Sequence, residues 1–246
     1  MRLEIAPFTN EHLTAAAELL AARHRADRER MPLLSPRFGE PAVAQMAVEE
    51  AWRAPQASGV VMLEADRVVG DLIGAPQIDE VRGRTAWISR AGYALASGQS
   101  AEVYRDLYAA LSPQWLTQGL FSHYALISAG DQAALAAWFA LSFGQEHCYG
   151  LRALTEADVA PGETTGDPSL TIRRATRDDL DAMIPIADTI PRYQAGSPVY
   201  APFVLEAMWP KQLLADYTEL VSNPQVALWL ALRDARIVGY QLYIPE

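Results

Sequence analysis

The stretch TAWISRAGYALASGQSAEVYRDLYAAL, residues 85–111, gives the strongest structural signal in this chain. Its first part, Thr85–Leu95, is apolar and rich in aromatic residues, which predicts a mostly buried strand. Ala96–Ser100 contains two serines and a glycine and is typical of a turn. Apolar residues then recur at helical spacing from Val103 to Leu111. The stretch therefore predicts a strand, a tight loop and a helix.

A strand, a tight loop and a helix start in this order form a place where a phosphate can bind. The N–H groups of the first helical turn point out of the helix, and the helix dipole favours an anion there. The same order is also a common structural unit with no ligand. The rest of the chain must distinguish these two interpretations.

The composition indicates a folded, acidic protein. The chain has 246 residues, half of them hydrophobic, which suits one large domain or two smaller ones. It carries 20 basic and 30 acidic residues, a net charge of −10. This balance argues against nucleic acid as a partner, because phosphate contacts need clustered Lys and Arg. It is compatible with a cationic amine as substrate, although acidity also serves solubility.

Cysteine, histidine and hydropathy patterns exclude several other classes. Cys148 is the only cysteine, so no internal disulfide can form, which suits a reducing cytoplasm. The N-terminus has no apolar signal region, and no apolar run approaches the roughly 20 residues of a membrane helix. We therefore expect a soluble, cytoplasmic protein that does not contact a membrane. The four histidines are scattered without ligand spacing, so we expect no metal site.

The N-terminal part predicts a strand, two helices and a hairpin. Leu3–Pro7 alternates and is typical of a short strand, and Thr9 is suited to cap the helix that follows. The basic run Arg23–Arg30 is interpreted as the solvated end of that helix, because cations complement the dipole there. The second helix and the two hairpin strands are expected at Ala42–Trp52, Val60–Leu63 and Val68–Ile73.

The middle of the chain predicts further elements and then a boundary. The helix of the opening stretch should run to about Gln118, and the next elements are a strand, a helix capped by Asp131 and a short strand. The two strands are expected at Phe121–Ser128 and His147–Leu154. Residues 154–169 are rich in Thr, Glu, Asp, Pro and Gly and predict a linker. The predicted domains are therefore 1–153 and 170–246.

After the predicted linker the sequence pattern starts again. LTIRRATRDDLDAMI from Leu170 matches LEIAPFTNEHLTAAA from Leu3 by residue type and position. Later, Arg236-Ile237-Val238-Gly239 corresponds to Arg67-Val68-Val69-Gly70 at a slightly longer offset. Two related segments in the same order predict two copies of one fold, of which the second reaches only its third strand.

This order of elements resembles the GCN5-related N-acetyltransferase (GNAT) superfamily. A strand followed at once by a Thr-capped helix starts each copy, and Val-Gly ends each hairpin. The family usually shows Asn-x-x-Ala-x-x-apolar-Tyr-x-x-Leu-Gly-Phe in its last helix. The matching positions here are Asp131, Ala134, Ala137, Trp138, Leu141, Ser142 and Phe143. The resemblance implies an α/β (α+β) fold, a mixed twisted sheet flanked by helices, with one complete and one partial copy.

The resemblance also implies a cofactor and a reaction. In this family the sheet opens between its fourth and fifth strands, and acetyl-coenzyme A (acetyl-CoA) lies in the opening. Its pyrophosphate lies on the loop after the fourth strand, and an amine attacks the thioester carbonyl directly. On this pattern, the cofactor contacts fall at Gly92, Ala94, Gln99, Ser100, Ala101 and Asp131.

The phosphate loop departs from the family pattern Gln/Arg-x-x-Gly-x-Gly/Ala. Gln99 fits, but Glu102 and Tyr104 replace the two small residues that let the backbone approach a pyrophosphate. Two like charges about 4 Å apart repel by about 4 kcal/mol at an effective dielectric near 20. This exceeds the roughly 1 kcal/mol that a helix terminus contributes. We therefore expect the first copy to bind coenzyme A weakly or not at all.

Candidates for catalysis are few. The family's Tyr, which protonates the leaving thiolate, is replaced by Trp138, whose indole N–H is no usable acid. Trp138 and Phe139 are therefore interpreted as core residues, and Asp131 as a plain N-cap. His123 and Tyr124 lie on the fifth strand, where alternation sends one to each face. At most one of the two can reach the opening.

Two functions follow from the resemblance. The first is an N-acetyltransferase that acetylates a small-molecule amine, with its catalytic copy completed by residues beyond Glu246. The second is a non-catalytic, GNAT-like module that binds a partner or a small ligand, which the lost glycines and missing Tyr favour. The partial copy also leaves a sheet edge uncovered, which predicts packing on the first copy or on another subunit in a homo-oligomer.

Overall fold

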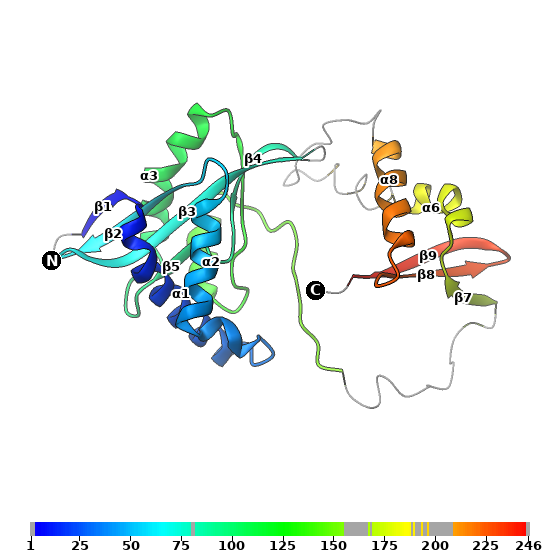
Figure 1. Ribbon diagram of the computed structural model, residues 1–246, viewed down its shortest axis with the longest axis horizontal. Helices are drawn as coiled ribbons and strands as arrows, with labels where there is room; N and C mark the ends of the chain where they lie inside the picture. The colour runs from blue at the N-terminus through cyan, green and yellow to red at the C-terminus, as the bar shows by residue number, and fades with distance from the viewer. Residues whose placement is uncertain are drawn as a thin grey trace. The chain divides into compact units, whose positions relative to one another are not determined.

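The computed structural model describes residues 3–79, 82–154, 167, 169–187, 189, 193, 196 and 209–244. The chain divides into two compact units, Met1–Ala153 and Leu154–Glu246, here called unit 1 and unit 2 (Figure 1). Most of the predicted linker, residues 154–169, lies outside the described residues.

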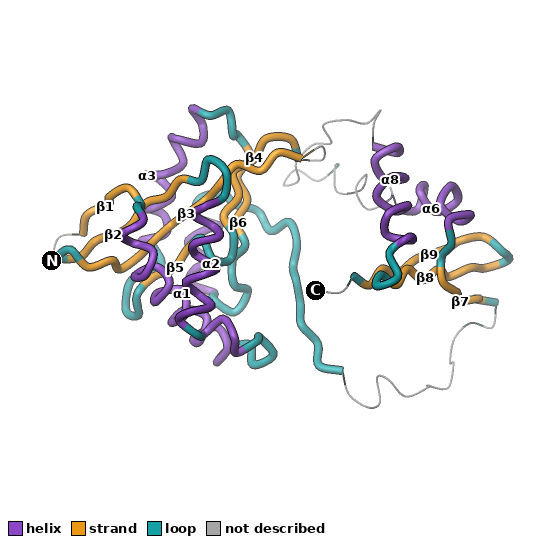
Figure 2. The backbone as a smooth tube through the Cα atoms, in the orientation of Figure 1, coloured by secondary structure: helices purple, strands orange, loops and turns teal. Residues whose placement is uncertain are grey.

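Unit 1 is a mixed sheet with helices on both faces (Figures 1 and 2). The strand order is β1-β2-β3-β4-β6, and β5 pairs with β3 beside this path. All pairs are antiparallel except β4 with β6, which is parallel. The strands are β1 Leu3–Pro7, β2 Ser58–Glu64, β3 Arg67–Asp79, β4 Gly83–Ile88, β5 Tyr93–Leu95 and β6 Ser122–Ala125. The α-helices are α1 Leu13–Arg30, α2 Pro41–Arg53, α3 Val103–Thr117 and α4 Gln132–Ala140.

The N-terminal elements confirm the predicted strand, cap and helices. Thr9 and His12 form a capping box over the short 3₁₀ turn Asn10–His12, which leads directly into α1. The interpretation of the basic run Arg23–Arg30 as solvated is wrong in part. Asp27 within that run is only 4% exposed, because this turn of α1 faces the sheet rather than solvent.

The predicted hairpin is confirmed as β2 and β3. Ala65 and Asp66 form its turn with φ of 49° and 65°, the left-handed backbone that a tight hairpin turn needs. A bulge lies between Met62 and Leu63, so that Leu63 pairs with Val68 but Met62 pairs with Gly70. The hairpin therefore carries a local twist at its start.

The prediction of one strand over Thr85–Leu95 is wrong. The segment forms two strands, β4 and β5, and both pair with the long strand β3. Between them the chain turns, and the Gly92 N–H donates to the Ser89 carbonyl at 2.9 Å. Because apolar character marks burial and not straightness, the sequence pattern does not show this turn.

Two apolar cores lie on the two faces of the sheet. The core under α3 and α4 contains Trp115 and Trp138, and the core under α1 and α2 contains Val48 and Ile73. Trp138 is 1% exposed, so its predicted core position is confirmed. Phe139 is 46% exposed, so its predicted core position is wrong, because it lies on the outer side of α4.

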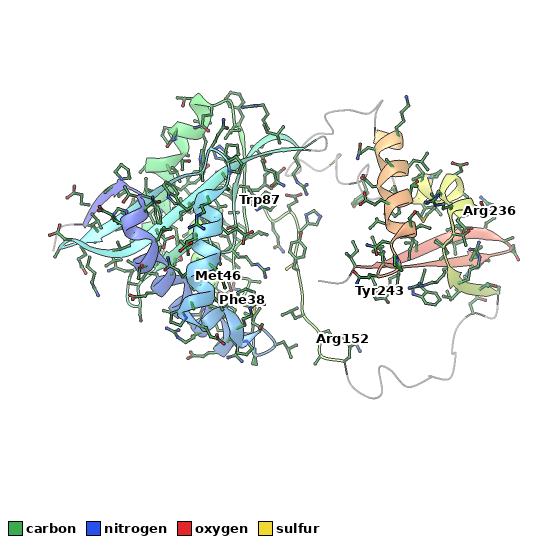
Figure 3. The ribbon with its side chains drawn as sticks, in the orientation of Figure 1. Phe38, Met46, Trp87, Arg152, Arg236 and Tyr243 are labelled. Carbon is green, nitrogen blue, oxygen red and sulfur yellow. The ribbon has the colours of Figure 1, made fainter. Side chains whose placement is uncertain are left out.

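The predicted strand His147–Leu154 is also wrong. Residues 144–154 carry no regular secondary structure, and their apolar side chains are exposed, with Tyr149 at 83% and Leu151 at 59%. Figure 3 shows Arg152 on this extended segment. A strand needs a neighbouring edge for its backbone hydrogen bonds, and this segment shows none.

Unit 2 has a small antiparallel sheet with helices packed against it (Figure 1). The strand order is β7-β8-β9. Thr176 and Asp179 form a capping box, and the Arg173 guanidinium donates two hydrogen bonds to the Asp179 carboxylate, at 2.6 and 2.8 Å. The elements are β7 Leu170–Arg174, α6 Leu180–Ala187, α8 Trp209–Ser222, β8 Ala227–Arg233 and β9 Arg236–Tyr243.

Two classes of site are not seen in the parts of the chain that the structure describes. No helix there is long and apolar enough to cross a membrane. Nor do three or more His, Cys, Asp or Glu side chains gather there in a way that could hold a metal ion.

Candidate functional site

The parallel strands β4 and β6 of unit 1 separate into two arms, which we call the fork. Pairing runs as far as Ile88 with Ala125, and the Leu126 N–H then donates to the Ile88 carbonyl at 3.0 Å. Beyond this point the first arm, residues 89–95, turns to pair with β3. The second arm, residues 126–131, leads into α4. The fork lies between the fourth and fifth strand positions of the sheet.

Gly92 and Ala94, two predicted cofactor contacts, lie on the first arm, and the neighbouring strand β3 packs closely against both. A Cβ at Gly92 would lie 2.4 Å from the Ile73 carbonyl oxygen, and the Gly92 carbonyl accepts from the Ile73 N–H at 2.7 Å. Ala94 is 1% exposed and pairs with Asp71 of β3. Glycine at position 92 therefore serves the close approach of two strands.

The loop before α3, where a pyrophosphate was predicted to lie, uses its own donors. The Val103 and Tyr104 N–H groups donate to the Ser100 and Ala101 carbonyls at 3.1 and 3.0 Å. The Glu102 N–H donates to Ser100 Oγ at 3.3 Å, and the Gln99 N–H donates to the Ala96 carbonyl at 3.1 Å. An anion bound by these four N–H groups would have to displace their internal hydrogen bonds. The Ser100 and Ala101 N–H groups donate no hydrogen bond to another described residue.

Two side chains of this loop take opposite roles. The Glu102 side chain is exposed and forms an ion pair with Arg105 one turn further along α3. Tyr104 is 3% exposed, with its ring centroid 5.5 Å from that of Tyr93 and 6.3 Å from that of Trp138. Burial raises the pKa of the Tyr104 phenol, so it stays neutral at ordinary pH. Tyr104 thus fills the interior at the end of the fork.

The other end of the fork is lined by α4. Asp131 is its N-cap, with Oδ1 accepting from the Ala134 N–H at 3.0 Å, and its second oxygen lies 3.9 Å from Arg30. The buried Trp138 indole N–H has no hydrogen-bond partner among the described residues. A donor that is buried without a partner costs free energy, so this N–H is available to an acceptor.

His123 and Tyr124 point to opposite faces of the sheet, as their alternation predicts. His123 Nε2 lies 2.9 Å from the Leu120 carbonyl, which can only accept, so Nε2 carries the proton. Nδ1 then accepts from the Tyr108 hydroxyl at 2.6 Å. Burial lowers the pKa of His123, so the ring is neutral. Both ring nitrogens are in use, and the ring packs against Trp115.

Tyr124 lies on the face away from α3, beside an aromatic neighbour. Its ring stacks on Trp87 of β4 at 5.4 Å between centroids and 24° between planes. The Arg82 guanidinium lies 5.6 Å from the Tyr124 ring centroid. The structure thus brings Trp138 into the fork region with Tyr104, and keeps His123 and Tyr124 in separate contacts.

Sequence reasoning missed three polar residues at the fork, namely Arg23, Asp27 and Asp71. Asp71 of β3 is 1% exposed, and neither carboxylate oxygen has a hydrogen-bond partner among the described residues. Burial raises the pKa of the Asp71 carboxyl to about 8, although the Arg23 charge opposes this. A lone carboxylate inside the apolar run Val68–Ile73 is the signal that could have identified it.

An open hollow of about 550 Å³ lies elsewhere, on α2. Its lining residues are Met46, Glu49, Glu50, Arg53 and Ala54, and Figure 3 shows Met46 on this helix. None of them belongs to the fork. Glu49 in the hollow is ion-paired with Arg53 at 2.7 Å and Glu50 is exposed, so its lining contains no buried group without a partner, and the fork remains the candidate site.

Comparisons with known proteins give a fold likeness only. No family model and no curated protein matches the chain. An aminoglycoside N-acetyltransferase solved with CoA matches at 15% identity, covering 62% of this chain and 95% of that one, with a TM-score of 0.45. A ribosomal-protein-alanine N-acetyltransferase from Brucella melitensis matches at 10%, covering 62% and 100%, with a TM-score of 0.45. A mutant protein from Bacillus halodurans matches at 16%, covering 61% and 99%, with a TM-score of 0.49. At these scores the likenesses carry no argument about function.

Proposed function

We propose that this chain belongs to an N-acetyltransferase of the GNAT type, which transfers an acetyl group from acetyl-CoA to a small-molecule amine. One observation carries the proposal: the parallel strands β4 and β6 separate directly before the loop and start of α3. A thioester placed between the two arms would meet both the loop and α4. The resemblance of the sequence to this superfamily supports the same assignment.

The proposed reaction is a direct acyl transfer. The amine nitrogen attacks the thioester carbonyl carbon, the C–S bond breaks, and the products are an amide and the free thiol of CoA. The amine gives up one proton and the leaving sulfur accepts one. A protein accelerates this step by holding the two reactants together and by stabilising the carbonyl oxygen as it becomes negative.

We also propose that unit 2 is the beginning of a second such fold and that unit 1 has a supporting role. The same strand, capped helix and bulged hairpin begin both units. In unit 1 four N–H groups of the loop and first turn of α3 are used internally, and Tyr104 fills the interior. These two observations support the inference that unit 1 in this closed arrangement does not hold the cofactor.

An acetyl-CoA consumption assay on the 246-residue chain tests the proposal. Release of the CoA thiol is followed with a thiol reagent across a panel of polyamines, amino acids and aminoglycosides, with an amine-free control. We expect slow thiol release at millimolar acetyl-CoA that requires one class of amine and yields its acetylated product, because the closed arrangement of unit 1 binds the thioester weakly. No thiol release above the amine-free control with any amine would contradict transfer and favour a non-catalytic module.

A non-catalytic, GNAT-like module is the second candidate. The specific observation in its favour is that the N–H groups of Val103 and Tyr104 donate within their own turn. A module of this kind would neither consume acetyl-CoA nor bind it. Equilibrium dialysis with acetyl-CoA at millimolar concentration distinguishes it from the transferase.

A further inference from the structure

The C-terminal half of α1 holds the first arm of the fork. The Arg23 guanidinium donates to the carbonyls of Tyr93 and Arg90, the latter at 2.5 Å. The same guanidinium lies over the Tyr93 ring, 4.0 Å from its centroid. A planar, permanently charged guanidinium suits this combination of two carbonyls and an aromatic face. One side chain of α1 therefore fixes both the backbone and the ring of the first arm.

The same half of α1 also holds the second arm. Asp27 Oδ1 accepts from the Ser128 hydroxyl at 2.9 Å. Arg30 lies 3.7 Å from Asp27 and 3.9 Å from Asp131, so it bridges α1 to the start of α4. Asp27 also lies 3.8 Å from Arg23, which joins the contacts to the two arms. We call Arg23, Asp27 and Arg30 the clasp.

A direct hydrogen bond joins the two arms beneath the clasp. The Ser128 N–H of the second arm donates to the Tyr93 phenol oxygen of the first arm at 3.0 Å. Tyr93 is 1% exposed, so this bond is shielded from water. Burial raises the pKa of Tyr93, which keeps the phenol neutral. Tyr93 thus occupies the space between the arms.

The closed fork leaves polar groups without partners. Both oxygens of Asp71, Arg23 Nε and Trp138 Nε1 are buried and have no hydrogen-bond partner among the described residues. They come from β3, α1 and α4 and face the region of Tyr93 and Tyr104. Buried polar groups in folded proteins are normally satisfied, and each unsatisfied group lowers stability. These groups would gain partners if the fork opened to water or to a polar ligand.

We propose that the clasp on α1 holds the fork closed, and that the fork admits a ligand only after the clasp opens. The ligand class rests on the proposed function: an acyl thioester whose amide and carbonyl groups can pair with the unpartnered donors and acceptors. The fork is then closed reversibly by three side chains, and the site can form again when their contacts break. The clasp also accounts for the buried Asp27 and the mostly covered Arg23 side chain in an otherwise basic, helical segment.

The test uses the full chain with Tyr93→Phe and Ser128→Ala combined. These changes remove the acceptor for the amide at position 128 and the donor to Asp27, while the Tyr93 ring stays under Arg23. Two hydrogen bonds at typical strength correspond to a roughly tenfold faster exchange of the position-128 amide with deuterium. Tyr108→Phe is the matched control, because it removes a half-buried phenol hydroxyl bound to His123 instead. Its position-128 amide should exchange at the wild-type rate.

Acetyl-CoA binding by the same variants completes the test. We expect the double variant to bind roughly tenfold more tightly than the wild-type chain and the Tyr108→Phe control. Unchanged exchange at position 128 in the double variant would overturn the clasp. Faster exchange without any gain in acetyl-CoA binding would confirm that these contacts hold the arms together. It would contradict an acyl thioester as the ligand, and with it the proposed function of the fork.

Discussion

Unit 1 and unit 2 begin with the same local structure. In both, a capped helix follows the first strand, and a hairpin turns through two residues with positive φ, Ala65-Asp66 in unit 1 and Asp234-Ala235 in unit 2. Both hairpins carry one bulge near the turn, between Met62 and Leu63 and between Ala231 and Leu232. Leu3 pairs with Glu64 as Leu170 pairs with Arg233.

The two units differ on the outer side of the hairpin. In unit 1, β3 pairs with β4 and β5, and its Asp71 is buried without a partner. In the described part of unit 2, β9 pairs with β8 only, and Tyr240 stands where Asp71 stands in unit 1. The Tyr217 hydroxyl donates to the Tyr240 hydroxyl at 2.9 Å. The comparison shows that the shared hairpin specifies a scaffold, and that the strands added to it create the candidate site.

The largest effect should come from Gly92→Ala. A Cβ there would meet the Ile73 carbonyl oxygen at 2.4 Å, so the two backbone segments must separate, at a cost of roughly 4 kcal/mol or more. Gly239→Ala in unit 2 is the matched control, because nothing lies within 4 Å of its Cβ. We expect urea unfolding of unit 1 to shift only for the first variant. Equal shifts for both would show that the outer side of β3 is not tightly packed.

A pH-dependent effect should follow from Asp71→Asn. Burial raises the pKa of Asp71 in the folded chain to about 8, well above its value of 3.8 as a free side chain. The folded state therefore binds a proton that the unfolded state has lost, so wild-type stability falls as pH rises from about 4 to 8. The variant lacks this loss and should be more stable near pH 8 by roughly 2 to 4 kcal/mol.

Thermal unfolding between pH 4.5 and 9 measures this effect of Asp71. The difference in free energy of unfolding between variant and wild type should increase up to about pH 8 and then stay constant. Tyr240→Phe provides the control in unit 2, because it changes the position equivalent to Asp71 in the second hairpin without removing a carboxyl group. A gap for Asp71→Asn that is independent of pH would mean that the carboxyl is not buried in solution.

The smallest effects should be the same in both units. Thr9→Ala and Thr176→Ala each remove the hydroxyl of a capping box, and each should cost about 1 kcal/mol. Equilibrium unfolding in urea, with a probe for each unit, gives the two values. A loss at Thr9 without a loss at Thr176 would indicate that the two capped helices are not equivalent.

The sequence predicted the parts of the fold that depend on neighbouring residues. Thr9 and Thr176 as caps, the paired apolar runs of both hairpins and the N-cap Asp131 are all local signals, and the structure contains each of them. The turn inside Thr85–Leu95 was missed because β3 is long enough to pair with both halves. A break of this kind depends on the partner strand.

The polar centre of the fork could not be predicted for a related reason. Arg23 and Asp27 look like solvated helix residues, and their burial depends on carbonyls and hydroxyls of distant segments, at Arg90 and Ser128. Only Asp71 is recognisable in the sequence, as an acidic residue in an apolar strand. Charged residues in a helical run need tertiary context before they can be assigned to a site.

In the wild-type chain the fork of unit 1 is closed by its own side chains, and the N–H groups of Val103 and Tyr104 at the start of α3 are already in use. Hydrogen exchange of the amides at residues 99–104, with and without acetyl-CoA at about 10 μM, measures whether the closed fork binds the thioester tightly. We expect the same exchange rates in both samples, because the fork is closed and Val103 and Tyr104 donate within their own turn. Slower exchange of these amides when acetyl-CoA is added would contradict this expectation.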